Sequence, residues 1–230
     1  MQVKLISHSQ SDGSYLIDST SATELVAFCA RVSNPGNQMN SETSEKLIKY
    51  LMKHKHWSPL EMVSVCLEIE TTRDIARQIL RHRSFSFQEF SQRYADPTKD
   101  LRFEYRQARL QDPKNRQNSI ELELSDWGKG GNKTQNDILA ENWMAKQEKV
   151  IRAAQEAYSW AINNGIAKEQ ARVVLPEGNT LSRLYVNGTL RSWIHYIELR
   201  GDNGTQLEHI RVAQECAKVI AKIFPLAEKV

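Results

Sequence analysis

The chain has 230 residues, of which 40% are hydrophobic and 26% charged, and it is long enough to bury a substantial core. Lysine plus arginine exceed aspartate plus glutamate by only 31 to 28, which argues against a protein that binds nucleic acid through net charge. The three cysteines, without CxxC spacing, are typical of a reducing compartment. No signal-peptide pattern is visible, and no segment approaches the roughly 20 apolar residues needed to cross a bilayer. We therefore expect a cytoplasmic protein without membrane contact.

The first quarter of the chain carries the signals of one strand and two helices. Residues 2–7, "QVKLIS", are typical of a short strand. Ser21 and Glu24 form a capping box, which predicts a helix over residues 21–33. A second helix is predicted over about residues 41–54.

A further helix start precedes the clearest strand signal in the sequence. Ser58, followed by proline and by Glu61, is predicted to cap a short helix. Residues 63–71 then alternate between apolar and polar side chains, which indicates a half-buried strand. Its apolar face is predicted to consist of Val63, Val65, Leu67 and Ile69. From residue 73 to about residue 80 the pattern becomes helical.

Helical periodicity dominates the rest of the chain. One more strand is predicted at residues 103–111, and residues 112–136, rich in Asn, Gln, Lys and Gly, indicate a polar excursion that we expect to be mobile. The remaining predicted helices lie at about residues 137–164, 167–175, 180–199 and 206–224. Because strands and helices do not alternate in a βαβ rhythm, we expect an α+β fold with an antiparallel or mixed sheet and several long helices. A single domain is expected over residues 1–230.

The segment around "RQILRHRSFSFQEFSQRY" concentrates cationic side chains. Residues 73–93 contain five arginines and no lysine, and Arg73, Arg77 and Arg81 share one helical face. Arginine is a planar donor suited to phosphate and carbonyl oxygens, so its use here indicates geometric recognition. Side chains that can read the edge of a heterocycle lie nearby, namely Gln78, Ser86, Gln88, Glu89 and Ser91. The expected ligand is a small anionic nucleotide.

Two other interpretations of these arginines stay open. They could form a solvated face paired with Asp74 and Glu89. They could also follow the phosphates of RNA or DNA, but the rest of the chain adds no basic stripe. Stacking on bases would then fall to Phe85, Phe87, Phe90 and Tyr94, whose spacing is more typical of core packing.

The histidines outside this segment carry weaker signals. His54 and His56 do not face one another on a helix, and no third ligand lies at metal spacing, so no metal site is expected. His195 lies one turn beyond Arg191 on the same face. The two side chains either grip an anion together, or His195 is a satisfied helix histidine.

The central motif resembles the signature of the flavin-dependent thymidylate synthase family, which is RHR, seven residues, then Ser. Arg81, His82 and Arg83 are followed by "SFSFQEF" and Ser91, and the longer motif continues through Glu89 and Arg93. The segments "HWSPLE", "ARVVLP" and "LRSWIHYIELR" also resemble segments of that family. The resemblance spans most of the chain and implies the thymidylate synthase-complementing fold.

The resemblance implies reductive methylation of dUMP to dTMP. Methylenetetrahydrofolate would supply the carbon, and FAD reduced by NADPH the hydride. It also implies a homotetramer whose active sites are shared among subunits. A cysteine nucleophile, as in flavin-free thymidylate synthases, is not expected, because Cys29, Cys66 and Cys216 have apolar neighbours in the sequence. A flavoprotein that methylates another uridine nucleotide is the alternative within the same fold.

The resemblance also assigns residues by motif position. The implied FAD contacts are Ser58, Arg81, His82, Arg83, Glu89, Arg191 and His195. The implied dUMP contacts are Gln78, Arg81, Glu89, Ser91, Arg93, Arg172 and Arg200. Arg200 is the implied catalytic residue, a fixed cation that stabilises the ionised pyrimidine. On an ideal helix Arg191 and Arg200 point in opposite directions, which suits one flavin contact and one substrate contact.

Some positions depart from the family pattern. Met62 stands where a second histidine is frequent, and Gln88 where an asparagine is frequent. The segment "NGTLRS" is one residue longer than the common form, so residues 187–190 receive no role. Neither does the polar excursion.

Overall fold

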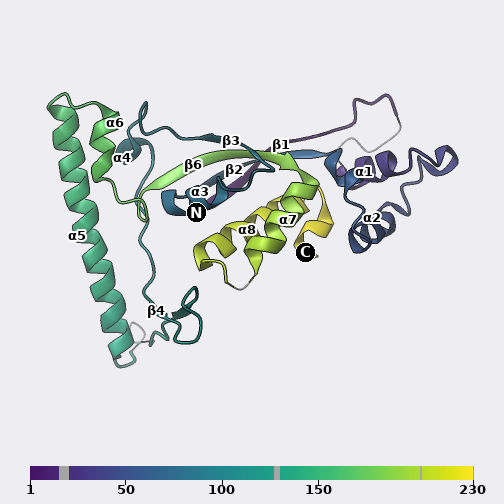
Figure 1. Cartoon of the computed structure of the whole chain (residues 1–230). Coiled ribbons are helices and arrows are strands. Elements are labelled where there is room, and N and C mark those ends of the chain that lie inside the picture. The colour runs from purple at the N-terminus through teal and green to yellow at the C-terminus, as the bar shows by residue number, and fades with distance from the viewer. Residues whose placement is uncertain (16–20, 127–129, 203, 230) are drawn as a thin grey trace.

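A computed structural model describes residues 1–15, 21–126, 130–202 and 204–229. Its centre is an antiparallel four-stranded sheet with the strand order β1-β2-β6-β3. The strands are β1 (Gln2–His8), β2 (Ser64–Thr72), β3 (Ser86–Glu89) and β6 (Leu181–Thr189). Helices α7 and α8 lie on one side of this sheet (Figure 1). The predicted α+β class with an antiparallel sheet is confirmed.

Strand β2 explains why the sheet has one buried face. Val65, Leu67 and Ile69 are all 0% exposed, as their alternation predicted. Helices α3 (Arg73–Ile79), α7 (Leu190–Gly201) and α8 (Leu207–Ala221) contribute to the same core. Trp193 of α7 is anchored to the sheet, since its Nε1 donates to the carbonyl oxygen of Val65 at 3.0 Å.

The opposite face of the sheet carries paired charges. The Glu68 carboxylate accepts hydrogen bonds from Lys4 at 3.2 Å and from the Tyr185 hydroxyl at 2.9 Å. Arg183 donates to Glu70 at 2.9 Å. These cross-strand pairs suit a face that the helices leave uncovered.

The prediction of one helix over residues 180–199 is wrong. Its first half is β6, which is hydrogen-bonded to β2 on one side and β3 on the other. Leu184 and Val186 point into the core, whereas Arg183 and Tyr185 do not, so the period is two. Pairing on both sides fixes the segment as a strand, in keeping with its Tyr, Val and Thr residues. Helix α7 then begins at Leu190.

The N-terminal helices follow their predicted signals more closely. Helix α1 (Ala22–Ala30) is capped by Ser21, whose Oγ accepts from the Glu24 amide at 3.2 Å. Helix α2 (Ser44–Lys53) lies within the predicted range. The prediction that Ser58 caps a helix is wrong, because η2 (Ser58–Glu61) is one 3₁₀ turn without a side-chain cap. The other short elements before β4 are η1 (Pro35–Asn37) and α4 (Pro97–Asp100).

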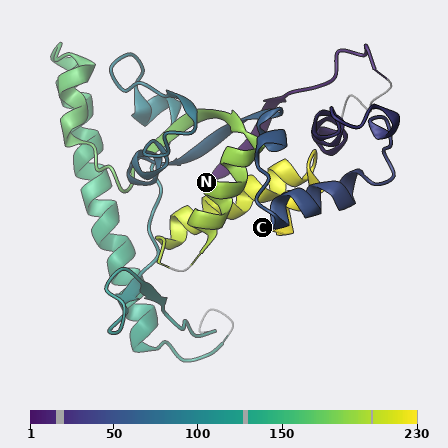
Figure 2. The same cartoon turned by 45° about the vertical axis from the view of Figure 1, so that its right-hand side comes forward.

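Helix α5 (Gln135–Asn163) stands beside the body of the molecule instead of packing along the sheet (Figure 2). Thr134 and Asp137 form a capping box at its start. It packs mainly against α6 (Lys168–Ala171) and η4 (Arg172–Val174). Much of its apolar surface is exposed, including Ile138, Leu139, Trp143, Met144, Val150 and Trp160.

The polar excursion contains structure that was not predicted. The expected strand at residues 103–111 is reduced to β4 (Arg109–Gln111), and β5 (Ser119–Glu121) pairs with it inside the excursion. The last element that the structure describes is η5 (Pro225–Lys229). None of the helices that the structure describes is both long and apolar enough to span a membrane.

Candidate active site

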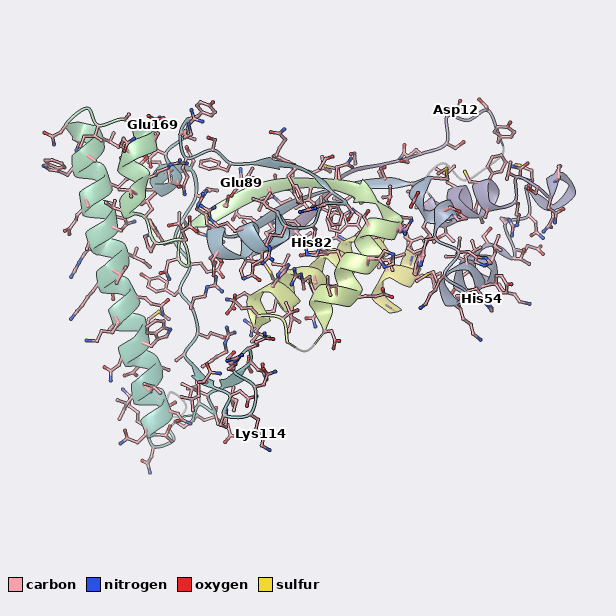
Figure 3. All side chains as sticks on the ribbon, viewed as in Figure 1. Asp12, His54, His82, Glu89, Lys114 and Glu169 are labelled. Carbon is pink, nitrogen blue, oxygen red and sulfur yellow. The ribbon has the colours of Figure 1, made fainter. Side chains whose placement is uncertain are left out.

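The segment just after α3 meets the last turn of α7 through a histidine and an arginine. Arg200 Nε donates to His82 Nε2 at 2.9 Å. Burial, then the nearby charges of Arg200 and Arg81, lowers the pKa of His82 to about 4. The imidazole is therefore neutral at physiological pH and can accept this hydrogen bond. Figure 3 places His82 between the sheet and the α7–α8 pair.

A buried histidine that the sequence analysis missed lies beneath this pair. His209 of α8 is 0% exposed, and its Nδ1 and Nε2 lie 3.2 Å from Gln78 Oε1 and 3.0 Å from the Tyr196 hydroxyl. The Tyr196 ring also contacts the His82 ring edge-on, at 5.0 Å between centroids. The structure thus joins Gln78, His82 and Arg200, three predicted site residues, through two buried aromatic side chains.

The shape of the loop after the RHR motif depends on a glycine. Phe85 packs on Trp193 and Tyr196, with ring centroids at 4.6 and 5.8 Å. A Cβ atom at Gly188 would lie only 2.3 Å from Phe85 Cδ1. Gly188 belongs to the segment that received no predicted role. The need for a glycine at this position can be inferred only once β6 is known to be a strand that lies beside this loop.

A second group of predicted residues surrounds the end of β3. Glu89 accepts from Ser182 Oγ at 2.7 Å, and its carboxylate lies 3.5 Å from the Arg73 guanidinium. Arg77 instead forms a two-bond pair with Glu177, both bonds at 2.6 Å. One alternative interpretation paired these arginines with Asp74. Asp74 instead accepts from Arg106 at 2.6 Å.

This second group borders a hollow of about 380 Å³. Its lining residues are Arg73, Arg77, Gln92, Glu169, Gln170, Arg172, Val173, Leu175 and Glu177. Arg93 lies 3.7 Å from the Glu169 carboxylate, while Arg172 Nε donates to the Glu169 carbonyl oxygen at 3.2 Å. Gln92 is only 4% exposed, and its Nε2 has no hydrogen-bond partner among the described residues. Arg172 and the unused amide donor of Gln92 suit an anion, whereas Arg77 is already paired with Glu177.

Ser91 lies between the RHR loop and this hollow in the sequence. Its Oγ accepts from the Arg93 amide at 3.4 Å. In Figure 3, Glu89 and Glu169 lie on the side of the molecule that carries α5 and α6. The predicted nucleotide contacts Glu89, Ser91, Arg93 and Arg172 therefore belong to one region.

A third group gathers where α7 begins. Arg191 pairs with Glu61 of η2, and the His195 ring packs on Trp57 at 4.5 Å between centroids. Ser58 is exposed in the same turn. Arg191 and Arg200 thus contact different parts of the molecule, as their spacing on a helix predicted. His195 also lies 3.6 Å from Glu198, so it has partners within the chain.

The cysteines and the other histidines bear on whether the protein uses a thiolate nucleophile or a metal ion. Burial raises the pKa of all three thiols, Cys29, Cys66 and Cys216, so a thiolate nucleophile is disfavoured at neutral pH. His54 and His56 both lie beside the exposed ring of Tyr50. Across the described ranges, no three His, Cys, Asp or Glu side chains gather in a way that could hold a metal ion.

The antiparallel sheet and the helices packed on it define an α+β fold with arginine-lined surfaces, and comparison with known proteins identifies its family. The model of the thymidylate synthase complementing protein family matches residues 15–226. The chain belongs to this family.

Its relatives cover nearly the whole chain. A probable flavin-dependent thymidylate synthase of Paramecium bursaria Chlorella virus 1 is 48% identical over 211 residues, which are 90% of this chain and 89% of the relative. The flavin-dependent thymidylate synthase of Synechocystis sp. is 47% identical over 201 residues, or 87% and 85% of the two chains. The crystal structure of a UMP/dUMP methylase from Streptomyces cacaoi, bound with 5-Br UMP, superposes with a TM-score of 0.75 at 26% identity. That match covers 99% of this chain and 92% of the other.

Proposed function

We propose that the protein catalyses the flavin-dependent reductive methylation of dUMP to dTMP. Methylenetetrahydrofolate supplies the one-carbon unit and NADPH the reducing equivalents. The observation that carries the proposal is the 2.9 Å hydrogen bond between Arg200 and His82. It links the RHR motif, implied to contact the flavin, to the arginine implied to act on the pyrimidine.

The residues present fit FAD. Arg81 and Arg83 are exposed just after α3, and Arg191 pairs with Glu61 in the turn that holds Ser58, so cationic groups are available for a pyrophosphate. His82 adds an uncharged ring that can contact a flavin. Reduced FAD, when bound, supplies the hydride for the transferred carbon. These residues hold and orient it.

Arg200 has the role of a preorganised cation. Its Nε is fixed by His82, so the guanidinium plane is set before the substrate arrives. A cation that needs no reorganisation stabilises negative charge as it develops on a pyrimidine. His82, with a pKa of about 4, is neutral at neutral pH, so Arg200 is the cation of this pair.

The dUMP phosphate is assigned to the hollow beside β3. Arg172 and Arg93 approach Glu169, and buried Gln92 keeps an unused donor there. Glu89 accepts from Ser182 and lies 3.5 Å from Arg73, which lines the hollow. The arrangement satisfies a dianionic phosphate with side-chain donors.

We also propose a homotetramer with shared active sites, located in the cytoplasm. Helix α5 exposes two tryptophans, Trp143 at 44% and Trp160 at 63%, along with several aliphatic side chains. An apolar surface of this kind suits contact with further copies of the chain. Subunit contact would also bring Arg191 and Arg172, which contact different parts of one chain, to one active site.

The proposal is tested by an anaerobic assay of the FAD-loaded protein with NADPH, methylenetetrahydrofolate and dUMP, with dTMP as the product scored. Absence of dTMP from a protein that binds and reduces flavin would refute the proposal. UMP is assayed in parallel, because the similar structure from Streptomyces cacaoi is that of a UMP/dUMP methylase. A colourless protein with steeply salt-dependent affinity for oligonucleotides would favour the nucleic-acid alternative.

A further inference from the structure

A row of hydrogen-bonded side chains, two of them fully buried, connects the predicted substrate contact Gln78 to a carboxylate. Gln78 Nε2 donates to Gln206 Oε1 at 2.9 Å, and Gln206 Nε2 donates to Glu208 Oε2 at 3.0 Å. On the other side, Gln78 Oε1 faces His209 Nδ1 at 3.2 Å, and His209 Nε2 faces the Tyr196 hydroxyl at 3.0 Å. These five side chains come from α3, α7, α8 and the residue before α8.

The carboxylate fixes the direction of every hydrogen bond in this row. Burial raises the pKa of Glu208, but the hydrogen bond from Arg109 and the charge of Arg106 outweigh it and bring the pKa to about 2. An ionised carboxylate only accepts, so Gln206 must turn its amide nitrogen toward Glu208 and its oxygen toward Gln78.

The same logic continues to the histidine. Gln78 gives an N–H to Gln206, so its oxygen faces His209, and His209 must carry its proton on Nδ1. His209 Nε2 is then an acceptor for the Tyr196 hydroxyl. Each member of the row therefore has one permitted orientation.

We infer that His209 is a positioning residue that fixes the amide orientation of Gln78, so that Gln78 offers its remaining N–H to an acceptor oxygen of the nucleotide. This inference rests on the proposed function, since it concerns the same substrate site. An amide free to rotate by half a turn would present its oxygen to the nucleotide in part of the molecules. Gln206 and His209 disfavour that orientation together, because a flipped Gln78 would place its oxygen against the Gln206 oxygen and its N–H against the Nδ1–H of His209.

The surroundings of His209 hold it in the required state. Its side chain is fully buried, and burial, then the charge of Arg200 and the nearby His82, lowers its pKa to about 3. Tyr196 is 1% exposed, and its hydroxyl donates to Nε2 when His209 carries its proton on Nδ1. Protonation, which would put a proton on both nitrogens, is thus disfavoured.

Two substitutions of His209 separate positioning from packing. In His209→Asn the side-chain nitrogen replaces Nδ1 and can still donate to Gln78. In His209→Gln the longer amide reaches toward Tyr196, and Gln78 loses its donor. We expect His209→Gln to raise the dissociation constant for dUMP about tenfold, the value of about one hydrogen bond, with unchanged flavin content. His209→Asn should raise it clearly less. Equal effects of the two substitutions would overturn the inference.

A double-mutant cycle tests whether His209 acts through Gln78. In the background Gln78→Ala, His209→Gln should cause no further loss of dUMP affinity. Additive losses would contradict the inference, since a purely structural defect adds to the first one. The affinity is measured by titration without turnover, so the result does not depend on dTMP formation.

The tautomer of His209 gives a test on the unmodified protein. ¹⁵N NMR of histidine-labelled protein should show His209 protonated at Nδ1 and not at Nε2 at neutral pH. The resonance is assigned from its loss in His209→Asn. A proton on Nε2 would overturn the inference even if dTMP is formed, whereas the Nδ1–H tautomer without dTMP would refute the proposed function alone.

Discussion

The buried histidine of α8 makes stability depend on pH above the range in which carboxylates titrate. An unfolded chain exposes His209 with an ordinary pKa of 6.5, whereas the folded protein lowers that pKa to about 3. Between these values the unfolded state binds a proton that the folded state does not. The free energy of unfolding therefore falls as the pH falls below about 6.5.

The size of this effect follows from the interval that is crossed. At pH 5 the pH lies about 1.5 units below the pKa of His209 in the unfolded chain. Protonation then stabilises the unfolded state by about 2 kcal/mol relative to the folded state. His82 contributes in the same direction, because its pKa is also lowered, to about 4. Glu208, with a pKa of about 2, stays charged throughout this range.

The assay compares the wild-type protein with His209→Gln in urea unfolding at pH 8 and pH 5, at one protein concentration. The substitution removes the titrating group, so its cost in free energy of unfolding should be about 2 kcal/mol smaller at pH 5 than at pH 8. An equal cost at both pH values would refute the reasoning, because His209 would then have the same pKa in both states.

Three further predictions concern the site and its surroundings. Arg200→Ala should keep bound flavin, seen in the absorption spectrum, but lose roughly a hundredfold or more in kcat for dTMP formation; full activity would remove Arg200 from its role. Gly188→Ala should lower the free energy of unfolding by about 1–3 kcal/mol, since the new methyl group would lie within a phenylalanine ring. Gly178→Ala is the matched control, because a Cβ there meets nothing within 4 Å. Trp143→Glu on α5 should shift light scattering toward smaller species, whereas Lys146→Glu on the same helix should not; a monomer in the wild type would contradict the proposed assembly.

The sequence predicted the elements whose pattern is local. Strand β2 carries its alternation within one segment, and its inward side chains are all fully buried. Helix α5 ends at Asn163, one residue from the predicted end, and its capping box lies within four residues at its start. The RHR motif was likewise readable, because its residue types stand next to one another in the sequence.

The elements that were mispredicted depend on partners far away in the chain. Strand β6 runs directly into helix α7, and its pairing with β2 and β3 involves residues far away in the chain. His209 stands in the apolar pattern of an amphipathic helix, and nothing nearby shows that its ring contacts Tyr196 and Gln78. Arg77 finds its carboxylate at Glu177, a hundred residues away. Side-chain contacts of this kind leave no local periodicity to detect.

The strand order has a consequence for how the chain is made. Strand β2 ends at Thr72, but its central neighbour β6 begins only at Leu181. At roughly 5–20 residues per second, a ribosome needs on the order of 5 to 20 seconds to supply the missing strand. During that time the nascent chain holds β2 with one edge unpaired and its apolar face uncovered by α7 and α8. The nucleus of the fold thus forms late in synthesis, and the half-made protein is the form most exposed to aggregation and to chaperones.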